Sequence, residues 1–255
     1  MQKKETPVKS YKNLDFLNSR NARTIRILSE YLEPLARLDR SKVNNTVLFL
    51  GSSKADPDDK DSQLTKYYWE AEDLAYQLAT WAISLKPRGK NFVICTGGGP
   101  GIMEAANRGA SRAGGKSIGM NISIPQEQFL NPYVSEELSF IFHYFFMRKF
   151  WLLYRAKAIV AFPGGFGTLD EVFETLTLVQ TGKIDRDHIV ILLYGEEYWE
   201  KIIDFEALMK QGAISPEDLS LLSFRSTPDE AFLFLKQRLS KYLQKETVLS
   251  DEDIS

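Results

Sequence analysis

Two glycine-rich segments of the chain have the composition of a phosphate-binding turn. The first runs from Thr96 to Gly101 (TGGGPG), and the second runs from Pro163 to Thr168 (PGGFGT). Each follows a short apolar run and precedes a helical pattern, so each is predicted to join a parallel strand to a helix. Glycine lets the backbone approach a ligand closely, and the free N–H groups at a helix start attract an anion. One such turn is equally compatible with a purely structural role, but two on one sheet favour phosphate binding.

Neither turn has the spacing of the common nucleotide-binding motifs. Ile102 and Asp170 stand where the last glycine of a GxGxxG dinucleotide fingerprint is required. Residues 115–117 (GKS) resemble the end of a P-loop, but Ala110 replaces its first glycine, and a strand rather than a helix follows. We therefore reject both a P-loop ATPase and an ordinary dehydrogenase.

Residues 168–171 (TLDE) allow two interpretations. They fit the S/T-x-x-E capping box, in which Thr168 and Glu171 would only cap the helix and contribute about 1 kcal/mol. Alternatively, Thr168 donates to a phosphate or ribose oxygen, and Glu171 faces the mouth of the site. The neighbouring glycines make the second interpretation competitive.

Arg148 and Lys149 supply the candidate cation. Consecutive helical positions lie about 100° apart, so one of the pair can face a pocket while the other turns away. A solvated basic pair is the common alternative. The neighbours are aromatic, however, and a charge embedded among them needs a carboxylate or phosphate partner.

Other reactive side chains are weaker candidates. Cys95 ends a predicted strand and has no histidine nearby in sequence, so we expect a buried structural cysteine. We expect His143 to be a core or interface histidine. For Glu104 two roles are equally compatible with the sequence. It either caps its helix or interacts with the helix dipole, or it lines the site.

Composition excludes several classes of protein. The 255 residues are 44% hydrophobic and 26% charged, which is typical of a globular chain. The 32 basic and 34 acidic residues give a net charge of -2, which argues against a general nucleic-acid binder. A single cysteine and two distant histidines predict no disulfide framework and no metal site, and we also expect no cofactor. The N-terminus lacks a secretory signal and no stretch of 18 apolar residues occurs, so we expect a cytoplasmic protein without membrane association.

Apolar runs alternate with helical patterns from residue 46 onward. This alternation predicts an α/β fold, with a Rossmann-like parallel sheet flanked by helices in one domain over residues 46–242. We expect an N-terminal arm over 1–45 and a polar acidic tail over 243–255. A helix is predicted over 21–39, although Pro34 weakens it. Its apolar residues at helical spacing are Ile25, Leu28, Leu32, Leu35 and Leu38. Strands are predicted within residues 46–53, 91–99, 116–124, 137–145, 157–165 and 187–195.

The same residues carry a family resemblance. Residues 163–171 (PGGFGTLDE) match the PGGxGTxxE motif of the Lonely Guy family, and Arg148-Lys149 resembles that family's upstream Arg-Lys pair. The first glycine turn and residues 51–53 (GSS) resemble two further elements, so that the likeness covers roughly residues 46–210. Members are cytokinin riboside 5'-monophosphate phosphoribohydrolases and related nucleosidases, long labelled "possible lysine decarboxylase".

The resemblance implies hydrolysis of the N-glycosidic bond of a nucleoside 5'-monophosphate, such as AMP or a cytokinin riboside monophosphate. The products would be the free base and ribose 5-phosphate. It implies catalysis by Arg148 and Glu171 and a homodimer or higher homo-oligomer. The implied substrate-binding residues are Gly97, Gly98, Gly99, Gly101, Met103, Glu127, Lys149, Gly164, Gly165, Gly167, Thr168 and Thr177.

Two other functions stay open on the same scaffold. One is a carrier that binds a nucleotide or molybdenum cofactor without hydrolysis, because a phosphate cradle alone does not imply chemistry. The other is a nucleotide-sensing regulator whose N-terminal arm contacts a partner. The base is also undetermined, because Phe146 and Met147 replace the His and Glu that precede the Arg in plant members.

Overall fold

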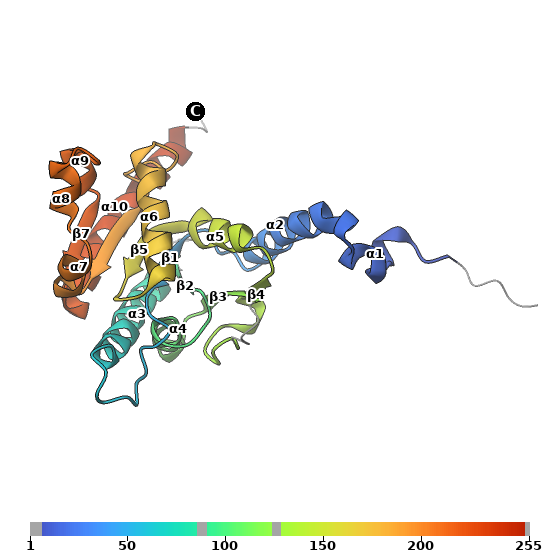
Figure 1. Ribbon diagram of the computed structural model, residues 1–255, viewed down its shortest axis with the longest axis horizontal. Coiled ribbons are helices and arrows are strands. Elements are labelled where there is room, and N and C mark those ends of the chain that lie inside the picture. The colour runs from blue at the N-terminus through green and yellow to red at the C-terminus, as the bar shows by residue number, and fades with distance from the viewer. Residues whose placement is uncertain (1–6, 86–90, 124–128, 253–255) are drawn as a thin grey trace, which may run out of the picture.

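A parallel sheet forms the centre of the molecule (Figure 1). The computed structural model describes residues 7–85, 91–123 and 129–252. In this part of the chain seven strands lie in the order β4-β3-β2-β1-β5-β6-β7, and every neighbouring pair is parallel. The strands are β1 Thr46–Leu50, β2 Val93–Thr96, β3 Ser117–Ile122, β4 Ser139–Phe142, β5 Ala156–Ala161, β6 Val190–Tyr194 and β7 Leu222–Arg225. The predicted α/β fold is therefore confirmed, and β7, which is only four residues long, is an addition to it.

Helices cover both faces of the sheet (Figure 1). Alternate strand side chains point to opposite faces, so Val47 and Phe49 join one apolar core while Leu48 and Leu50 join the other. The first core includes α3 Thr65–Leu85, α4 Ile102–Arg112 and α10 Pro228–Glu252. The second includes α2 Arg23–Arg40, α5 Phe145–Tyr154 and α6 Phe166–Gln180. Burial on both sides explains why the strands read as nearly continuous apolar runs.

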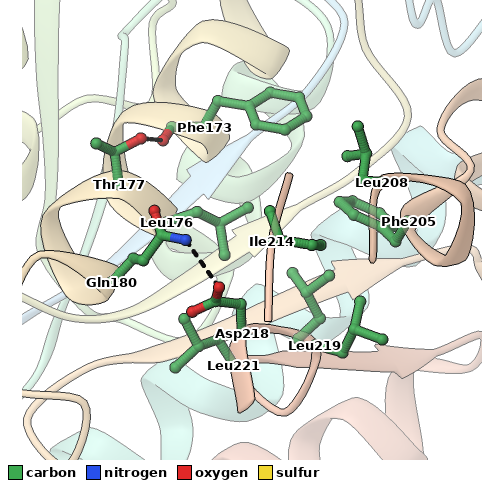
Figure 2. A pocket seen from close by; sticks show the side chains of 11 residues that line it. Phe173, Leu176, Thr177, Gln180, Phe205, Leu208, Ile214, Asp218, Leu219 and Leu221 are labelled. Atoms are coloured by element: carbon green, nitrogen blue, oxygen red, sulfur yellow. Dashed lines mark hydrogen bonds between the residues drawn. The ribbon is translucent and has the colours of Figure 1, made fainter. Parts of the chain in front are cut away.

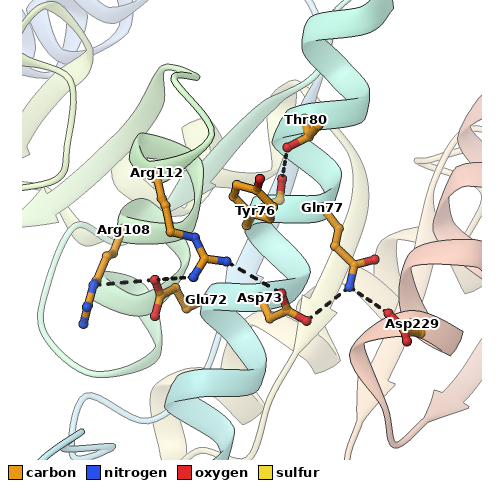
Figure 3. Close-up of polar contacts among 8 residues, drawn as sticks. All are labelled: Glu72, Asp73, Tyr76, Gln77, Thr80, Arg108, Arg112 and Asp229. Atoms are coloured by element: carbon orange, nitrogen blue, oxygen red, sulfur yellow. Dashed lines mark hydrogen bonds and ion pairs between the residues drawn. The ribbon is translucent and has the colours of Figure 1, made fainter.

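A polar network fastens α3 to its neighbours (Figure 3). The buried Glu72 carboxylate lies 3.2 Å from Arg112 Nη1 and 3.6 Å from Arg108 Nε, both on α4. Gln77 Nε2 donates to Asp73 of the same helix and to Asp229 at the start of α10. A buried carboxylate is costly without partners, so these cations fix α3 against α4.

The predicted N-terminal helix is present as α2, with Pro34 buried inside it. Only part of its predicted apolar stripe faces the core. Leu38 is buried and Leu35 half-buried, whereas Ile25, Leu28 and Leu32 are between 44% and 52% exposed. Tyr31 was not among the residues that the pattern predicted. Its ring centroid lies 5.7 Å from the ring centroids of Phe150 and Trp151 of α5.

The C-terminal region differs from the sequence prediction in two ways. The helical pattern over residues 196–212 predicts one helix, but the chain forms α7 Glu196–Ile202 and α8 Phe205–Lys210. Asp204 separates them because its side chain caps α8 by accepting from Ala207 N at 2.8 Å. A short α9, Pro216–Leu219, follows, and α10 continues ten residues past the predicted domain end at 242. The division into arm, domain and tail stays a prediction.

Candidate active site

The candidate site lies where the strand order reverses. The chain passes from β1 through β2 and β3 to β4 on one side and then returns to pair β5 with the other side of β1. Ligands of open α/β sheets bind at the carboxyl ends of strands near such a switch point. A cavity of about 430 Å³ opens here. It is lined by Phe49, Leu50, Gly51, Ser52, Ser53, Lys54, Gly97, Met103, Ile122, Phe145, Arg148, Gly165, Phe166, Gly167, Thr168 and Glu171.

The loop after β1 joins the two glycine turns. Ser52 N donates to Pro163 O at 3.0 Å, and Ile102 N donates to Ser52 O at the same distance. Gly101 has a φ of +70°, and a Cβ atom there would clash with Ser52 O. The turn from Gly98 to Gly101 therefore holds the loop after β1 in place. Its own residues do not line the cavity.

The second turn leads directly into α6. Its N-cap is Gly165, and no side chain caps the helix. The capping-box interpretation of Thr168 and Glu171 is therefore wrong, because the helix begins at Phe166 and both residues lie buried inside it. The first N–H groups of a helix have no intrahelical acceptor, so this start offers donors and positive potential to a ligand.

Arg148 and Glu171 meet inside the cavity. Arg148 Nη1 lies 3.5 Å from Glu171 Oε1, and Arg148 Nε donates to Met120 O at 2.7 Å. A Cβ atom at Gly97 would clash with Arg148 Nη2, so glycine at this position makes room for the guanidinium. Burial raises the pKa of Glu171 to about 7, an effect that the charge of Arg148 opposes. Burial likewise lowers the pKa of Arg148.

Lys149 turns away from this cavity. Its Nζ atom lies 2.9 Å from Asp170 Oδ2 and 2.8 Å from Glu174 Oε2, and so ties α5 to α6. The expectation that one of the two basic residues faces the pocket is met by Arg148. The geometry gives Lys149 structural ion pairs outside the cavity lining, and its predicted contact with substrate stays a prediction.

Thr177 lies apart from the other predicted residues. It is exposed on α6, where its Oγ1 donates to Phe173 O at 2.8 Å. It lines a separate, mainly apolar pocket of about 100 Å³ between α6, α8 and β7 (Figure 2). The one carboxyl group there, Asp218, accepts a hydrogen bond from Gln180 at 2.8 Å. Hydrogen bonds from Ser215 and Gln180 lower the pKa of Asp218, which does not suit it to proton transfer near neutrality. Glu127 lies outside the described residues.

Residues 103–234 match the protein family described as "Possible lysine decarboxylase". This span is more than half of the chain. The chain belongs to this family.

Curated relatives are similar to this chain in sequence, and a solved structure is similar to it in fold. The chain is 27% identical over 206 residues to a rice protein named "Probable cytokinin riboside 5'-monophosphate phosphoribohydrolase", covering 80% of this chain and 86% of that one. An Arabidopsis thaliana cytokinin riboside 5'-monophosphate phosphoribohydrolase is 26% identical over 208 residues, with the same two coverages. The fold resembles that of a molybdenum-cofactor carrier protein from Chlamydomonas reinhardtii, with a TM-score of 0.51. That structure is 23% identical and aligns with 78% of this chain and 99% of its own.

The sequence patterns did not predict some of the residues that line the cavity in this family member. Lys54 follows the Gly-Ser-Ser strand end, and its position one residue beyond that motif was the available signal. Phe145 and Phe166 give the mouth an aromatic lining and are 51% and 92% exposed. No local pattern marks an aromatic residue as a ligand contact.

The other reactive side chains contribute nothing to the cavity. Cys95 is buried as expected, and burial raises the pKa of its thiol to about 12. Glu104 accepts a hydrogen bond from Tyr68 at 3.0 Å and lines no part of the cavity. His143 is exposed, which contradicts the expected core position and leaves the interface position a prediction. Among the described residues no group of three or more His, Cys, Asp and Glu side chains is arranged to hold a metal ion.

Proposed function

We propose that the protein hydrolyses the N-glycosidic bond of a nucleoside 5'-monophosphate to give a free base and ribose 5-phosphate. The observation that carries the proposal is the buried Arg148–Glu171 pair, 3.5 Å apart, in the cavity that also contains the uncapped start of α6. The names of the curated relatives support this class of reaction. They describe a cytokinin nucleotide as substrate of those proteins, and we extend only the nucleoside monophosphate to this chain.

The 5'-phosphate is held by the second glycine turn. Gly165 and Gly167 have nothing within 4 Å of the position that a Cβ atom would take, so a ligand can reach the backbone there. Thr168 Oγ1 and the N–H groups at the start of α6 are donors for phosphate oxygens. Lys54 lines the same cavity and forms no ion pair with another described residue, which leaves its charge for the phosphate.

Glu171 and Arg148 act at the scissile bond. When the C1'–N bond breaks, the sugar acquires oxocarbenium character, which the Glu171 carboxylate stabilises. The carboxylate also orients the water whose hydroxyl adds to C1', and the proton of that water ends on the departing base. Arg148 stabilises the leaving base electrostatically, because a guanidinium is too weak an acid to donate the proton.

The base lies against an apolar wall. Phe145 and Ile122 line the cavity on the side of Arg148, and Phe166 stands at its mouth. Aromatic side chains stack on any nucleobase, so this wall accepts a flat ring without selecting its edge groups. AMP is therefore the first substrate to test.

The active unit is a homodimer in this proposal. Ile25, Leu28 and Leu32 of α2 and Phe146, Phe150 and Tyr154 of α5 are all large, apolar and exposed. The two helices pack side by side (Figure 1), and a contiguous exposed apolar area of this kind is typical of a protein interface. No helix among the described residues meets the length and hydropathy needed to cross a membrane. The cytoplasmic location stays a prediction.

A panel of nucleoside monophosphates tests the proposal. Purified protein is incubated with AMP, GMP, IMP, CMP, UMP and a cytokinin riboside monophosphate, and free base and ribose 5-phosphate are separated by chromatography. We expect release from at least one purine nucleotide and none from adenosine, which lacks the phosphate. If bound nucleotide is recovered intact from every incubation, the hydrolase is wrong and a carrier role is favoured.

A further inference from the structure

The helix that carries Arg148 begins against a carboxylate from the N-terminal segment. Glu30 of α2 accepts two backbone hydrogen bonds, from His143 N to Oε1 at 2.8 Å and from Tyr144 N to Oε2 at 3.2 Å. Tyr144 is the N-cap of α5, and no side chain of its own caps that helix. Glu30 therefore anchors the backbone at the N-cap and at the residue before it, in the way that the N3 carboxylate of a capping box accepts from the N-cap N–H.

The same residue holds α5 at a second point. Trp151 Nε1 donates to the backbone carbonyl of Glu30 at 2.9 Å. Trp151 is only 1% exposed, so this hydrogen bond lies within the core between the two helices. Glu30 thus fixes the start of α5 and a position almost two turns further along, and Arg148 lies between these two points.

Arg148 has little tolerance for displacement. Its backbone N donates to Tyr144 O at 3.1 Å, so a shift at Tyr144 moves Arg148 directly. Its guanidinium fits between Met120 O, the backbone at Gly97 and the Glu171 carboxylate. Misplacement of a catalytic group by about 1 Å can cost about 100-fold in rate.

We propose that Glu30 is a positioning residue for Arg148, which it holds in place by fixing the start of α5. The effect on turnover rests on the proposed function, while the effect on α5 does not. Glu30 precedes the span that matches the family, so in this proposal a residue of the N-terminal segment supports the active site. The partner-binding role considered for the same segment stays a prediction.

Three variants test this inference. Glu30→Ala removes both acceptors, Glu30→Gln keeps one, and Glu33→Ala is the matched control. Glu33 lies on the same helix, but its exposed carboxylate contacts, among the described residues, only Arg37, at 3.1 Å. For Glu30→Ala we expect kcat for AMP to fall about tenfold with KM changed less than about twofold, because the interaction lost acts mainly in the transition state. Glu30→Gln should be intermediate, and Glu33→Ala should match the wild type.

Hydrogen exchange followed by mass spectrometry gives a readout independent of activity. Glu30→Ala should speed amide exchange over residues 143–154, while Glu33→Ala should leave that segment unchanged. Unchanged exchange in Glu30→Ala overturns the inference, and so does faster exchange with unchanged kcat. Equal loss of kcat in Glu30→Ala and Glu33→Ala also overturns it. If the wild type hydrolyses no nucleotide, the proposed function fails, and the exchange over 143–154 alone decides whether Glu30 holds α5.

Discussion

The Arg148 guanidinium lies 3.5 Å from the Glu171 carboxylate, and the two side chains are only 12% and 7% exposed. They come from α5 and α6, which flank β5, and they meet in the cavity beside the second glycine turn. Burial raises the pKa of Glu171 to about 7 even with Arg148 beside it. A carboxyl group that changes charge near neutral pH in a cleft is a feature of catalytic sites.

Replacing Glu171 by Gln should separate binding from chemistry. The amide keeps the size of the side chain but cannot carry the negative charge that stabilises the sugar cation. We expect kcat for AMP to fall by about 10²–10⁴-fold, while AMP binding measured by calorimetry stays within a few-fold of the wild type. Unchanged turnover in Glu171→Gln would remove this residue from the mechanism.

Turnover should depend on pH through Glu171. Its pKa is raised to about 7, so the carboxylate is the main form above that pH and the neutral acid is the main form below it. If the carboxylate is the active form, kcat falls as pH drops through about 7. The profile should be measured at saturating AMP, because the phosphate of the free substrate ionises near pH 6. A kcat that instead rises toward low pH would assign Glu171 the role of an acid.

Lys54→Ala should weaken substrate binding more than chemistry. Lys54 lines the cavity, and in the proposed function its charge serves the phosphate. We expect KM for AMP to rise about tenfold with a small change in kcat, and the difference should shrink in high salt. Lys60→Ala is the control, since Lys60 is exposed on the same loop and lines no part of the cavity. An equal effect of both substitutions would argue against a specific phosphate contact.

Two neighbouring glycines should respond to alanine in opposite ways. A Cβ atom at Gly164 would clash with Thr168 Oγ1, so Gly164→Ala should destabilise the protein by about 1–3 kcal/mol and lower Tm. A Cβ atom at Gly167 meets no protein atom within 4 Å and projects where the ligand is expected. Gly167→Ala should therefore keep or raise Tm, since alanine favours a helix, yet raise KM. Thermal melting and kinetics on both variants check this, and an unchanged KM in Gly167→Ala would place the phosphate elsewhere.

A charge on α2 should weaken the proposed dimer. Leu28 is 52% exposed on the apolar face of α2 and α5, and Ile202 on α7 is 51% exposed. Analytical ultracentrifugation should show Leu28→Glu shifted toward monomer and Ile202→Glu unchanged, because burying a charge in an interface is costly. If the wild type is monomeric at tens of micromolar, a stable dimer through this face is ruled out.

Much of the fold was readable from local patterns. Each predicted strand corresponds to an observed strand, because these apolar runs are too short for a helix and alternate with longer helical patterns. The glycine turns were equally clear, since a strand-to-helix turn that approaches a ligand needs glycine wherever it lies in the fold. The break between α7 and α8 was missed because its signal is one capping residue, Asp204, inside an otherwise helical pattern.

The sequence by itself determined the family motifs, the parallel sheet and the candidates Arg148 and Glu171. Those signals are local in the chain, so they can be read from the sequence alone. The tertiary structure decided which of Arg148 and Lys149 faces the cavity, that Glu171 is no cap, and that Thr177 lies apart. It also placed Lys54 in the cavity lining and Glu30 against the start of α5. Such choices depend on packing between segments far apart in sequence, such as Glu30 against Tyr144, and no local pattern encodes that contact.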